Sequence, residues 1–405
     1  MHNRSNNRNK PKQGGRKRPN QGGAGRGRGR QGGGFKKSTL DPTLLIRKGV
    51  SVEFNEYRSD RLIKDLPVDS LLIEALLDKG FERPTEIQDK TLEALLESRD
   101  LLGIAKTGTG KTGAFLIPII HQLIQHNQKP FALVVVPTRE LAIQVEEEFK
   151  SMTKNLKLYS ACFIGGTNIN SDIRKLNRAC HVIIATPGRL LDLVTRKQID
   201  LRKFNTLILD EFDRMLDMGF VHDVKRIIHG MQQRKHTLLF SATMDKKQKE
   251  LIADILTDPV SVKLSDGEST GDHIDQDIIR ITGDDDKFKI LCDMINGSNV
   301  NKVLVFEETK HKVNKLCTKL NKTGIKSDQI QGNKSQNARQ RALKAFKNGS
   351  IKVLVATDVA ARGIDVEDIS HVFNYQVPLS YDSYIHRIGR TGRAGKSGKA
   401  FTFVD

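Results

Sequence analysis

One short glycine-rich stretch limits what this chain can fold into more than any other part of it. Residues 105–112 follow an apolar run at 101–105 and precede a helix-like stretch at 113–125. Glycines in such a turn let backbone N–H groups point at phosphate oxygens, and the pattern requires a strand before it and a helix after it. A chance match or an ordinary strand-to-helix turn is the alternative. Because both flanking elements are indicated, we predict a nucleotide phosphate loop here.

The residues of this loop have separate expected tasks. Lys111 is expected to reach the β and γ phosphates and to act in catalysis, and the Thr112 hydroxyl is expected to bind Mg²⁺. Ala105 stands where the general pattern has glycine. The residues predicted to contact the nucleotide are Ala105, Lys106, Thr107, Gly108, Thr109, Gly110, Lys111 and Thr112.

The composition of the 405 residues allows two or three domains and argues against several classes of protein. Hydrophobic residues make up 37% of the chain, enough for real cores. The four cysteines lie far apart with no C-x-x-C pair, which argues against a zinc site or a disulfide framework and fits a reducing compartment. No apolar run approaches the about 18 residues of a membrane span, so we expect a cytoplasmic protein with no membrane partner.

The net charge of +19 is concentrated near the N-terminus. Residues 1–40 hold twelve lysines and arginines, ten glycines and no acidic residue, whereas the rest of the chain holds 55 basic and 48 acidic side chains. This segment has too little apolar surface to offset the entropy that its chain would lose on folding. Residues 1–48 are therefore predicted to form a disordered basic tail. The Gly-Arg run at 25–30 resembles tails that track nucleic-acid backbones. Counterion release favours nucleic-acid contact over a merely solubilising tail.

Strand-like and helix-like stretches alternate from residue 100 onward, which is typical of an α/β fold with helices on both faces of a parallel sheet. A polar stretch at 265–272 interrupts the alternation. We therefore predict a first domain at 60–264, a linker at 265–275 and a second domain at 276–405. An amphipathic helix is predicted at 62–79. Strands are predicted at 131–136, 181–185, 206–209, 237–240, 302–306, 352–356, 371–375 and 399–404.

Clustered acids follow the strand predicted at 206–209. Since the carboxyl ends of strands in such a sheet border the crevice where ligands bind, Asp210 is expected to hold Mg²⁺. Glu211 is expected to orient or deprotonate the water that attacks the γ-phosphate. Acids after a strand are often only a solvated loop. The phosphate loop about 100 residues upstream favours the catalytic interpretation.

These motifs, with others along the chain, give it a family resemblance that covers nearly everything after the basic tail. The chain resembles the DEAD-box ATP-dependent RNA helicases, with Asp-Glu-Phe-Asp as a variant acidic box, and residues 214–220 weakly suggest the bacterial RhlE-like branch. The order of the motifs is more specific than any one of them. The resemblance implies two tandem RecA-like domains with parallel sheets. The matching segments are 80–88, 105–112, 137–142, 165–166, 186–189, 210–213, 241–243, 336–339, 356–365 and 386–393.

The resemblance implies ATP hydrolysis with residues from both domains. Arg390 and Arg393 match an arginine finger and its companion, which suit developing phosphate charge, although an Arg-rich helix is also compatible with a solvated face. The amide side chain of Gln88 suits the adenine edge because it both donates and accepts hydrogen bonds. The alternative is that Thr85 only caps a helix and Gln88 is an ordinary surface residue. The further nucleotide contacts implied are Phe81, Arg83, Thr85, Gln88 and Asp365.

The resemblance also implies coupling and RNA contacts. Residues implied to join the ATP site to domain closure, or alternatively to form local caps, are Asp213, Ser241, Thr243 and His386. Contacts to phosphate and sugar carry no base sequence, and contacts to the 2′-hydroxyl favour RNA. The residues implied to line the RNA path are Pro137, Thr138, Arg139, Gly166, Thr186, Arg189, Thr309, Gly332, Arg339 and Thr357.

Several positions depart from the family pattern. Phe212 replaces the alanine of the acidic box, and its benzyl group needs room that could be taken from Asp213. Ile63 stands where the family usually carries an aromatic that packs on adenine. The triplet at 331–333 and Gln376 also differ from the usual residues.

The sequence thus predicts an Mg²⁺-ATP-dependent RNA helicase that hydrolyses ATP to ADP and phosphate and remodels RNA without base specificity. Ribosomal or RNA-decay proteins are expected as partners by analogy alone. One alternative is an ATP-gated RNA clamp or annealing chaperone in which Phe212 has silenced turnover. A DNA-directed helicase is the other. RNA-stimulated phosphate release separates the first alternative from a helicase, and competition between RNA and DNA separates the second.

Overall fold

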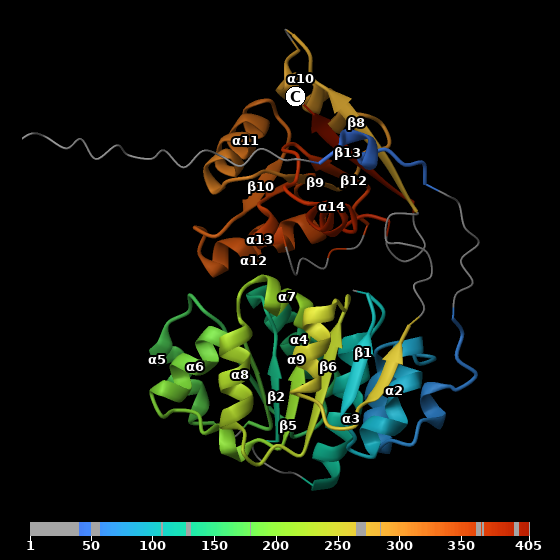
Figure 1. Ribbon diagram of the computed structural model, residues 1–405, viewed down its shortest axis with the longest axis vertical. Helices are drawn as coiled ribbons and strands as arrows, with labels where there is room; N and C mark the ends of the chain where they lie inside the picture. The colour runs from blue at the N-terminus through green and yellow to red at the C-terminus, as the bar shows by residue number, and fades with distance from the viewer. Residues whose placement is uncertain are drawn as a thin grey trace, which may run out of the picture. The chain divides into compact units, whose positions relative to one another are not determined.

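Two α/β domains, each built on one parallel sheet, make up most of the computed structural model (Figure 1). The structure describes residues 40–49, 57–106, 108–126, 131–178, 180–264, 273–283, 285–361, 366, 368–392 and 397–404. Residues 1–39, Thr107, Asp365 and Arg393, which carry predictions made above, lie outside the described residues. Within the described part of the chain, no helix is long and apolar enough to cross a membrane.

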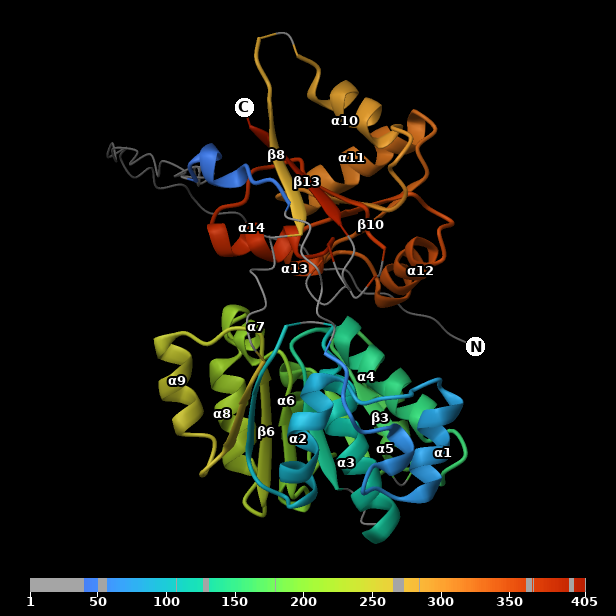
Figure 2. The ribbon, with the colours of Figure 1, turned by 90° about the vertical axis from the view of Figure 1, so that its right-hand side faces the viewer.

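The first domain has a seven-stranded sheet with helices on both of its faces (Figure 2). Five of its strands are buried along their whole length, and four of these consist largely of aliphatic residues, as is typical of strands in a parallel sheet covered on both faces. All neighbouring strands pair in parallel. In spatial order the strands are β3 (Ser160–Phe163), β4 (Val182–Ala185), β2 (Ala132–Val135), β5 (Thr206–Leu209), β6 (His236–Ser241), β1 (Leu101–Ile104) and β7 (Val260–Lys263).

Helices connect these strands, so most carboxyl ends of strands lead directly into a helix N-terminus. The single helix predicted at 62–79 is instead a 3₁₀ turn at Ile63–Asp65 followed by α1, because the Asp69 carboxylate accepts from the N–H of Leu71 and starts a new helix. The helices of the first domain are α1 (Ser70–Asp78), α2 (Glu86–Leu96), α3 (Lys111–His126), α4 (Arg139–Met152), α5 (Ile169–Leu176), α6 (Pro187–Thr195), α7 (Phe212–Asp217), α8 (Val221–Gly230) and α9 (Lys246–Ala253).

The second domain repeats this plan with six parallel strands. Its first strand, β8, begins at Ile274, inside the range predicted as linker. In spatial order the strands are β10 (Ser327–Ile330), β11 (Val353–Ala356), β9 (Val303–Phe306), β12 (His371–Asn374), β13 (Gly398–Val404) and β8 (Ile274–Arg280). The helices are α10 (Lys287–Ile295), α11 (Lys310–Lys322), α12 (Gln336–Lys347), α13 (Asp358–Ala361) and α14 (Tyr381–Ile388).

The end of the predicted tail is folded, which corrects the boundary at residue 48. A 3₁₀ turn at Pro42–Leu45 packs against the second domain, where Leu45 is fully buried in the same core cluster as Ile274. Arg47 then forms an antiparallel bridge with Gln276 on β8. The segment joins the sheet edge because Leu45 is buried and the backbone of Arg47 pairs with that of Gln276, although the segment lies next to a polar, glycine-rich stretch.

Candidate nucleotide and nucleic-acid site

The glycine-rich loop lies at the carboxyl end of β1 and leads into α3. Gly108 and Gly110 have φ values of +86° and +93°, a backbone conformation that strongly favours glycine. Lys111, at the first position of α3, is 6% exposed, and its ammonium donates to the carbonyl of Ala105 at 2.7 Å. The lysine is therefore held inside the loop it belongs to, where it is placed to exchange this carbonyl for a phosphate oxygen.

Gln88 supports the loop from α2. Its side-chain amide donates to the carbonyl of Gly110 at 3.1 Å, and its carbonyl oxygen accepts from the N–H of Thr85 at 3.0 Å. A Cβ at Gly110 would lie 2.5 Å from the Thr85 hydroxyl, and one at Gly113 would lie 2.5 Å from the Gln88 amide nitrogen. The glycines at 110 and 113 thus permit α2 to contact the phosphate loop directly.

The other residues predicted to contact adenine have structural partners. The Arg83 guanidinium donates to the carbonyl of Ser59, and Phe81 packs against the first core cluster with the Lys79 ammonium 5.4 Å from its ring centroid. Ile63 is fully buried in that cluster. Ile63 therefore has no exposed surface for a base, so adenine stacking at the position where the family carries an aromatic is not available to it.

Two carboxylates with opposite electrostatics follow β5. Burial raises the pKa of Asp210 to about 6, although the nearby Lys111 ammonium lowers it. Burial also raises the pKa of Glu211, but its ion pair with Arg214 outweighs burial, and the pKa lies below its ordinary value. Glu211 has a positive φ of 54°, which is uncommon for a residue with a side chain and is found at strained functional positions. At neutral pH both side chains are thus predominantly ionised beside the phosphate loop.

Asp213 links the acidic box to the loop after β6. Its carboxylate accepts from the N–H of Thr243 at 3.0 Å and from the Thr243 hydroxyl at 3.1 Å, and its own N–H donates to the Ser241 hydroxyl at 3.3 Å. Phe212 is 1% exposed within the second core cluster of the domain. The benzyl group therefore occupies the core, and the contacts of Asp213 form beside it.

The predicted nucleic-acid residues of the first domain lie on the other half of its sheet. Thr138 follows β2, Gly166 follows β3 and Thr186 follows β4, and these three strands are neighbours in the order β3-β4-β2. The Thr138 hydroxyl accepts from the N–H of Leu141 at the start of α4, and Thr186 precedes Pro187 at the start of α6. Two helix N-termini thus lie on neighbouring strands, where backbone N–H groups can receive phosphate oxygens.

The two predicted arginines of this half lie against the loop after β3, and Arg189 is held there by protein groups. Gly166 has a φ of +80°, and a Cβ on it would lie 2.4 Å from an Arg139 guanidinium nitrogen, so glycine is required where Arg139 crosses this loop. Arg189 is 9% exposed, donates to the carbonyl of Thr167 at 2.6 Å and pairs with Asp172 at 3.3 Å. Arg189 thus fixes the loop that carries Gly166. Pro137, which precedes Thr138, is buried.

The second domain places its predicted nucleic-acid residues in the matching order. Thr309 follows β9 and its hydroxyl accepts from the N–H of Lys312, capping α11. Thr357 follows β11, Gly332 follows β10 and Arg339 lies on α12. In the triplet at 331–333, the side-chain amide oxygen of Gln331 accepts from the N–H of Asn333 at 2.8 Å, so the replaced residues close a turn of their own.

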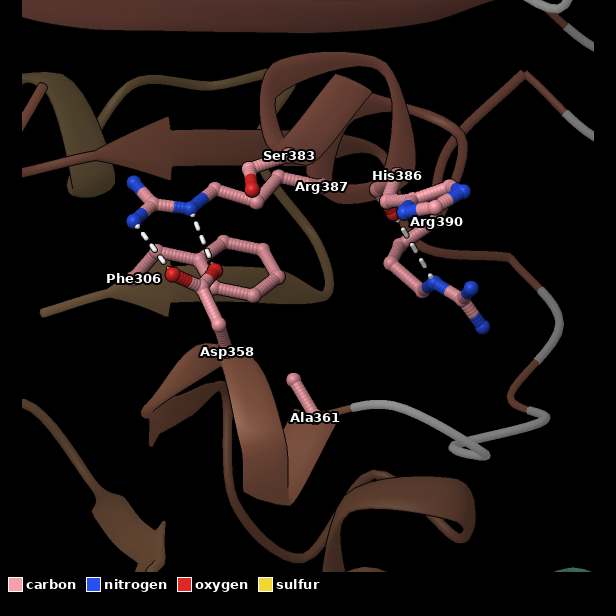
Figure 3. Close-up of a pocket in the computed structure, with 7 residues that line it drawn as sticks. All are labelled: Phe306, Asp358, Ala361, Ser383, His386, Arg387 and Arg390. Atoms are coloured by element: carbon pink, nitrogen blue, oxygen red, sulfur yellow. Dashed lines mark hydrogen bonds and ion pairs between the residues drawn. The ribbon is translucent and has the colours of Figure 1, made fainter. Parts of the chain in front are cut away.

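A buried arginine holds α14, the helix that precedes the predicted arginine finger (Figure 3). Arg387 on α14 makes a bidentate ion pair with Asp358, at 2.5 and 2.8 Å, and its guanidinium carbon lies 5.1 Å from the Phe306 ring centroid. It also donates to the Asn374 side chain and to the backbone carbonyl of Gln376. Because Gln376 contributes its carbonyl, this contact does not depend on the side chain that replaces the family's usual residue.

Arg390 follows α14 by two residues. Its Nε donates to the carbonyl of His386 at 3.3 Å, and both residues line a small cavity with Asp358 and Arg387 (Figure 3). His386 is exposed, so its side chain lies at the surface of the second domain. The structure therefore brings three of the four predicted coupling residues together in the first domain, Asp213, Ser241 and Thr243, and places His386 on the second.

Comparisons with known proteins agree with this division. A family model described as DEAD/DEAH box helicase matches residues 85–251, and one described as Helicase conserved C-terminal domain matches residues 286–395. The DEAD-box ATP-dependent RNA helicase CshA of Bacillus cereus is 40% identical over 341 residues, which cover 84% of this chain and 65% of CshA. The chain belongs to the DEAD-box helicase family. It spans about 65% of the length of that relative.

Solved DEAD-box structures share the fold. The structure of S. cerevisiae Dbp5 bound to RNA and ADP BeF3 matches with a TM-score of 0.74 and 30% identity, covering 85% of this chain and 89% of Dbp5. The structure of Mss116p bound to ssRNA and AMP-PNP matches with a TM-score of 0.76 and 31% identity, covering 88% and 77% of the two chains. The predicted fold of two tandem RecA-like domains is thereby confirmed.

Two residues of this DEAD-box chain have a role that the motif pattern did not assign. Asp358 and Arg387 lie inside the matched segments 356–365 and 386–393, yet neither was predicted as a site residue. Spacing alone does not reveal an ion pair between residues 29 positions apart. The signal that could have found it is the exclusively apolar strand before Asp358, which places an acid at the carboxyl edge of the second sheet.

Proposed function

We propose that this chain is an RNA-stimulated ATPase that remodels RNA, hydrolysing ATP to ADP and phosphate in each cycle. The observation that carries the proposal is the group at the carboxyl ends of β1, β5 and β6: the phosphate loop, Asp210 with Glu211, and Asp213 bonded to the loop at Thr243. These groups supply phosphate binding, a general base and a connection to the rest of the domain. RNA and ATP analogues bound to Dbp5 and Mss116p support the choice of ligands.

Mg²⁺ is part of the proposal, and the residues present fit it. Asp210 is 2% exposed, and Thr112 is the first residue after the loop lysine on α3. One carboxylate and one hydroxyl are an ordinary protein contribution to a magnesium ion that keeps several waters and binds substrate phosphates. When bound, the ion neutralises charge that develops on the phosphates.

The hydrolytic step is assigned to residues of both domains. Glu211 orients the attacking water and accepts its proton, while Lys111 holds the phosphates. Arg390, and Arg393 if its family role carries over, would stabilise the charge that builds on the γ-phosphate. Arg390 lies just after α14, which is held by the Arg387–Asp358 pair, and its bond to the His386 carbonyl attaches it to that helix.

RNA contact is proposed along the β3-β4-β2 and β10-β11-β9 halves of the two sheets. The helix N-termini there bind phosphate oxygens without reading bases, which supports action on RNA of any sequence. The basic stretch at 1–39 adds sequence-independent affinity through its charge. A cytoplasmic location, ribosomal or RNA-decay partners and the RhlE-like branch are part of this proposal at the level of analogy.

Phosphate release by the full chain with and without single-stranded RNA tests this function. We expect RNA-stimulated turnover that Glu211→Gln lowers by roughly 10²- to 10⁴-fold, the usual contribution of a general base. Asp217→Asn, at an exposed position on the same helix α7, is the control and keeps the parent rate. Competition with DNA of the same sequence should leave the stimulation intact.

A clamp without turnover is the competing function, and one observation weighs against it. Phe212 lies in the core while Asp213 keeps its contacts to the loop at Ser241 and Thr243. If the parent chain binds ATP and RNA but releases no phosphate, and Phe212→Ala restores release, the clamp is the correct function.

A further inference from the structure

The segment 40–49, here named the clip, belongs to the second domain although it precedes the first domain in the chain. Leu45 is 0% exposed and lies in one core cluster with Ile274 and Tyr384. The Tyr384 hydroxyl is 3.3 Å from the Leu45 carbonyl oxygen and 3.0 Å from the Gln276 side-chain oxygen. Figures 1 and 2 both draw the clip beside β8.

Backbone hydrogen bonds attach the clip to the edge of the second sheet. The N–H of Arg47 donates to the carbonyl of Gln276 at 2.9 Å, and the N–H of Gln276 donates to the carbonyl of Arg47 at 2.7 Å. The N–H of Gly49 donates to the Asp275 carboxylate at 2.9 Å. A Cβ at Gly49 would lie 3.2 Å from the N of Asp275, so the two backbones are in close contact.

A comparison of the two sheets indicates what the clip replaces. In the first domain the outer edge of β1 is covered by β7, which follows the last helix of that domain. In the second domain β8 is the edge strand, and the clip forms the bridge on its outer side. An exposed edge strand invites pairing with another chain, so a cover at this position has a physical purpose of its own.

We propose that the clip anchors the basic stretch 1–39 on the second domain, so that this stretch adds its RNA affinity there. The proposal rests on the proposed RNA-binding function and deepens it. Residue 40 is the first described residue and is covalently joined to a stretch that holds twelve basic residues and no acidic one. Two further basic residues, Arg47 and Lys48, are exposed on the clip itself.

Anchoring changes the effective concentration of the tail rather than its charge. With the clip docked, the tail begins at the surface of the second domain. With the clip undocked, the first fixed point is Tyr57, whose hydroxyl donates to Asp89 of the first domain. The connection then lengthens by the clip and the residues at 50–56. Because effective concentration falls as roughly the −3/2 power of the connecting length, the tail loses part of its benefit although every charge remains.

Leu45→Asp in the full chain tests docking without reference to RNA, and Leu44→Asp is its matched control. Leu44 is the preceding residue of the same 3₁₀ turn but is 57% exposed. We expect Leu45→Asp to abolish hydrogen-exchange protection at the amides of Arg47 and Gln276, and Leu44→Asp to leave it unchanged. Equal protection in all three proteins overturns the docking.

A second variant covers the case in which Leu45→Asp disturbs the second domain as a whole. Arg47→Pro removes the backbone donor to Gln276, and Arg47→Gln removes the same charge but keeps that donor. Loss of protection at Gln276 with Arg47→Pro alone, with an unchanged β12, supports the clip. Loss of protection with both variants attributes the effect to the side chain and contradicts the backbone attachment.

RNA affinity tests the consequence, with a single-stranded RNA of mixed sequence as the probe. We expect Leu45→Asp to weaken binding about three- to tenfold at about 0.1 M salt, and to have no effect once residues 1–39 are deleted or when salt is raised to about 1 M. An effect of Leu45→Asp that persists in the deletion variant overturns the proposal. RNA binding that is absent from every protein overturns the proposed function as well, whereas protection of Gln276 would still stand.

Discussion

One half of the sheet is arranged alike in the two domains, and the other half differs between them. On the β3-β4-β2 half of the first and the β10-β11-β9 half of the second, a threonine caps the helix after the innermost strand of the half: Thr138 after β2 and Thr309 after β9. On the opposite halves the first domain carries the phosphate loop and the acids, whereas the second carries Arg387 and Arg390. The nucleic-acid half is therefore duplicated, and the chemical half is divided.

This division explains why neither domain is expected to hydrolyse ATP alone. The first domain has the proposed phosphate cradle, general base and metal ligand, but the described arginine beside that base, Arg214, is paired with Glu211. The second domain has the permanently charged Arg390, bonded to the last turn of α14, but no phosphate loop in its sequence. The loop proposed to bind ATP thus lies on the first domain, and the arginine proposed to stabilise the transition state lies on the second.

Arg390→Ala gives the largest expected effect and tests the divided half. Loss of an arginine finger costs roughly 10³ to 10⁵ in kcat in related phosphoryl-transfer enzymes, and we expect a loss in that range with ATP binding by the first domain retained. Arg341→Ala, at an exposed position on α12, is the control. Steady-state phosphate release and equilibrium binding of a fluorescent ATP analogue measure the two quantities. Unchanged kcat would place the stabilising charge elsewhere.

Asp358→Ala has the next largest expected effect and tests whether the Arg387–Asp358 pair holds α14 in place. It leaves the Arg387 guanidinium, whose side chain is 4% exposed, without its carboxylate partner. Because the Asp358 side chain is 34% exposed, we expect a loss of about 1 to 3 kcal/mol in the second domain and none in the first, less than the about 3 to 5 kcal/mol of a fully buried pair. Urea unfolding followed by hydrogen exchange in β12 and in β5 separates the domains. Equal losses in both would mean that the pair is not local to the second domain.

Mg²⁺-nucleotide binding should depend on pH through Asp210. Burial raises the pKa of Asp210 to about 6, and only the ionised form binds a metal, so affinity should be full above that pH and fall about tenfold by pH 5. Glu211 has a lowered pKa and stays ionised over this range. Calorimetry with Mg²⁺-ADP measures the binding affinity as a function of pH. The Asp210→Asn variant shows how much of the pH dependence comes from the nucleotide's own phosphates. Identical profiles would remove Asp210 from the metal site.

Much of this comparison could be predicted from the sequence. Parallel strands that are buried on both faces are largely apolar, so Val353–Ala356 and Thr206–Leu209 were recognisable. The loop at 105–112 was recognisable because a strand-like run precedes it and a helix-like run follows it. Strands with mixed residues, such as Ser327–Ile330, gave no such signal. The clip was missed because one buried leucine in a polar segment resembles many exposed ones, and its partner strand lies more than 200 residues later.

Contacts within the site were harder to predict than the site itself. The interaction of Gln88 with Gly110, and that of Arg189 with Asp172, join residues whose types suggest ligand contact. Side-chain type indicates which partners are chemically acceptable, and only the fold decides whether a backbone carbonyl or a ligand takes that place. The position of Phe212 in the core is a similar case, since available volume cannot be read from spacing.

The smallest expected effect tests the duplicated half directly. Thr138→Val and Thr309→Val keep side-chain volume but remove the hydroxyls that accept from Leu141 and Lys312. Loss of such a cap costs about 1 kcal/mol, and because the same hydroxyl can donate to phosphate, we expect RNA affinity to fall about fivefold in each variant.

The two variants should be equal and additive if the halves are equivalent, because the two hydroxyls cap different helices and accept from different residues, Leu141 and Lys312. Ser380→Ala is the matched control: it removes the cap of α14, on the divided half, and should cost stability without changing RNA affinity. Fluorescence anisotropy with a labelled single-stranded RNA measures the parent, the three single variants and the double threonine variant. Weakened binding in Ser380→Ala of the same size would mean that cap loss acts through stability alone, and a fivefold loss confined to one threonine would mean that the RNA contacts are not duplicated but belong to one domain.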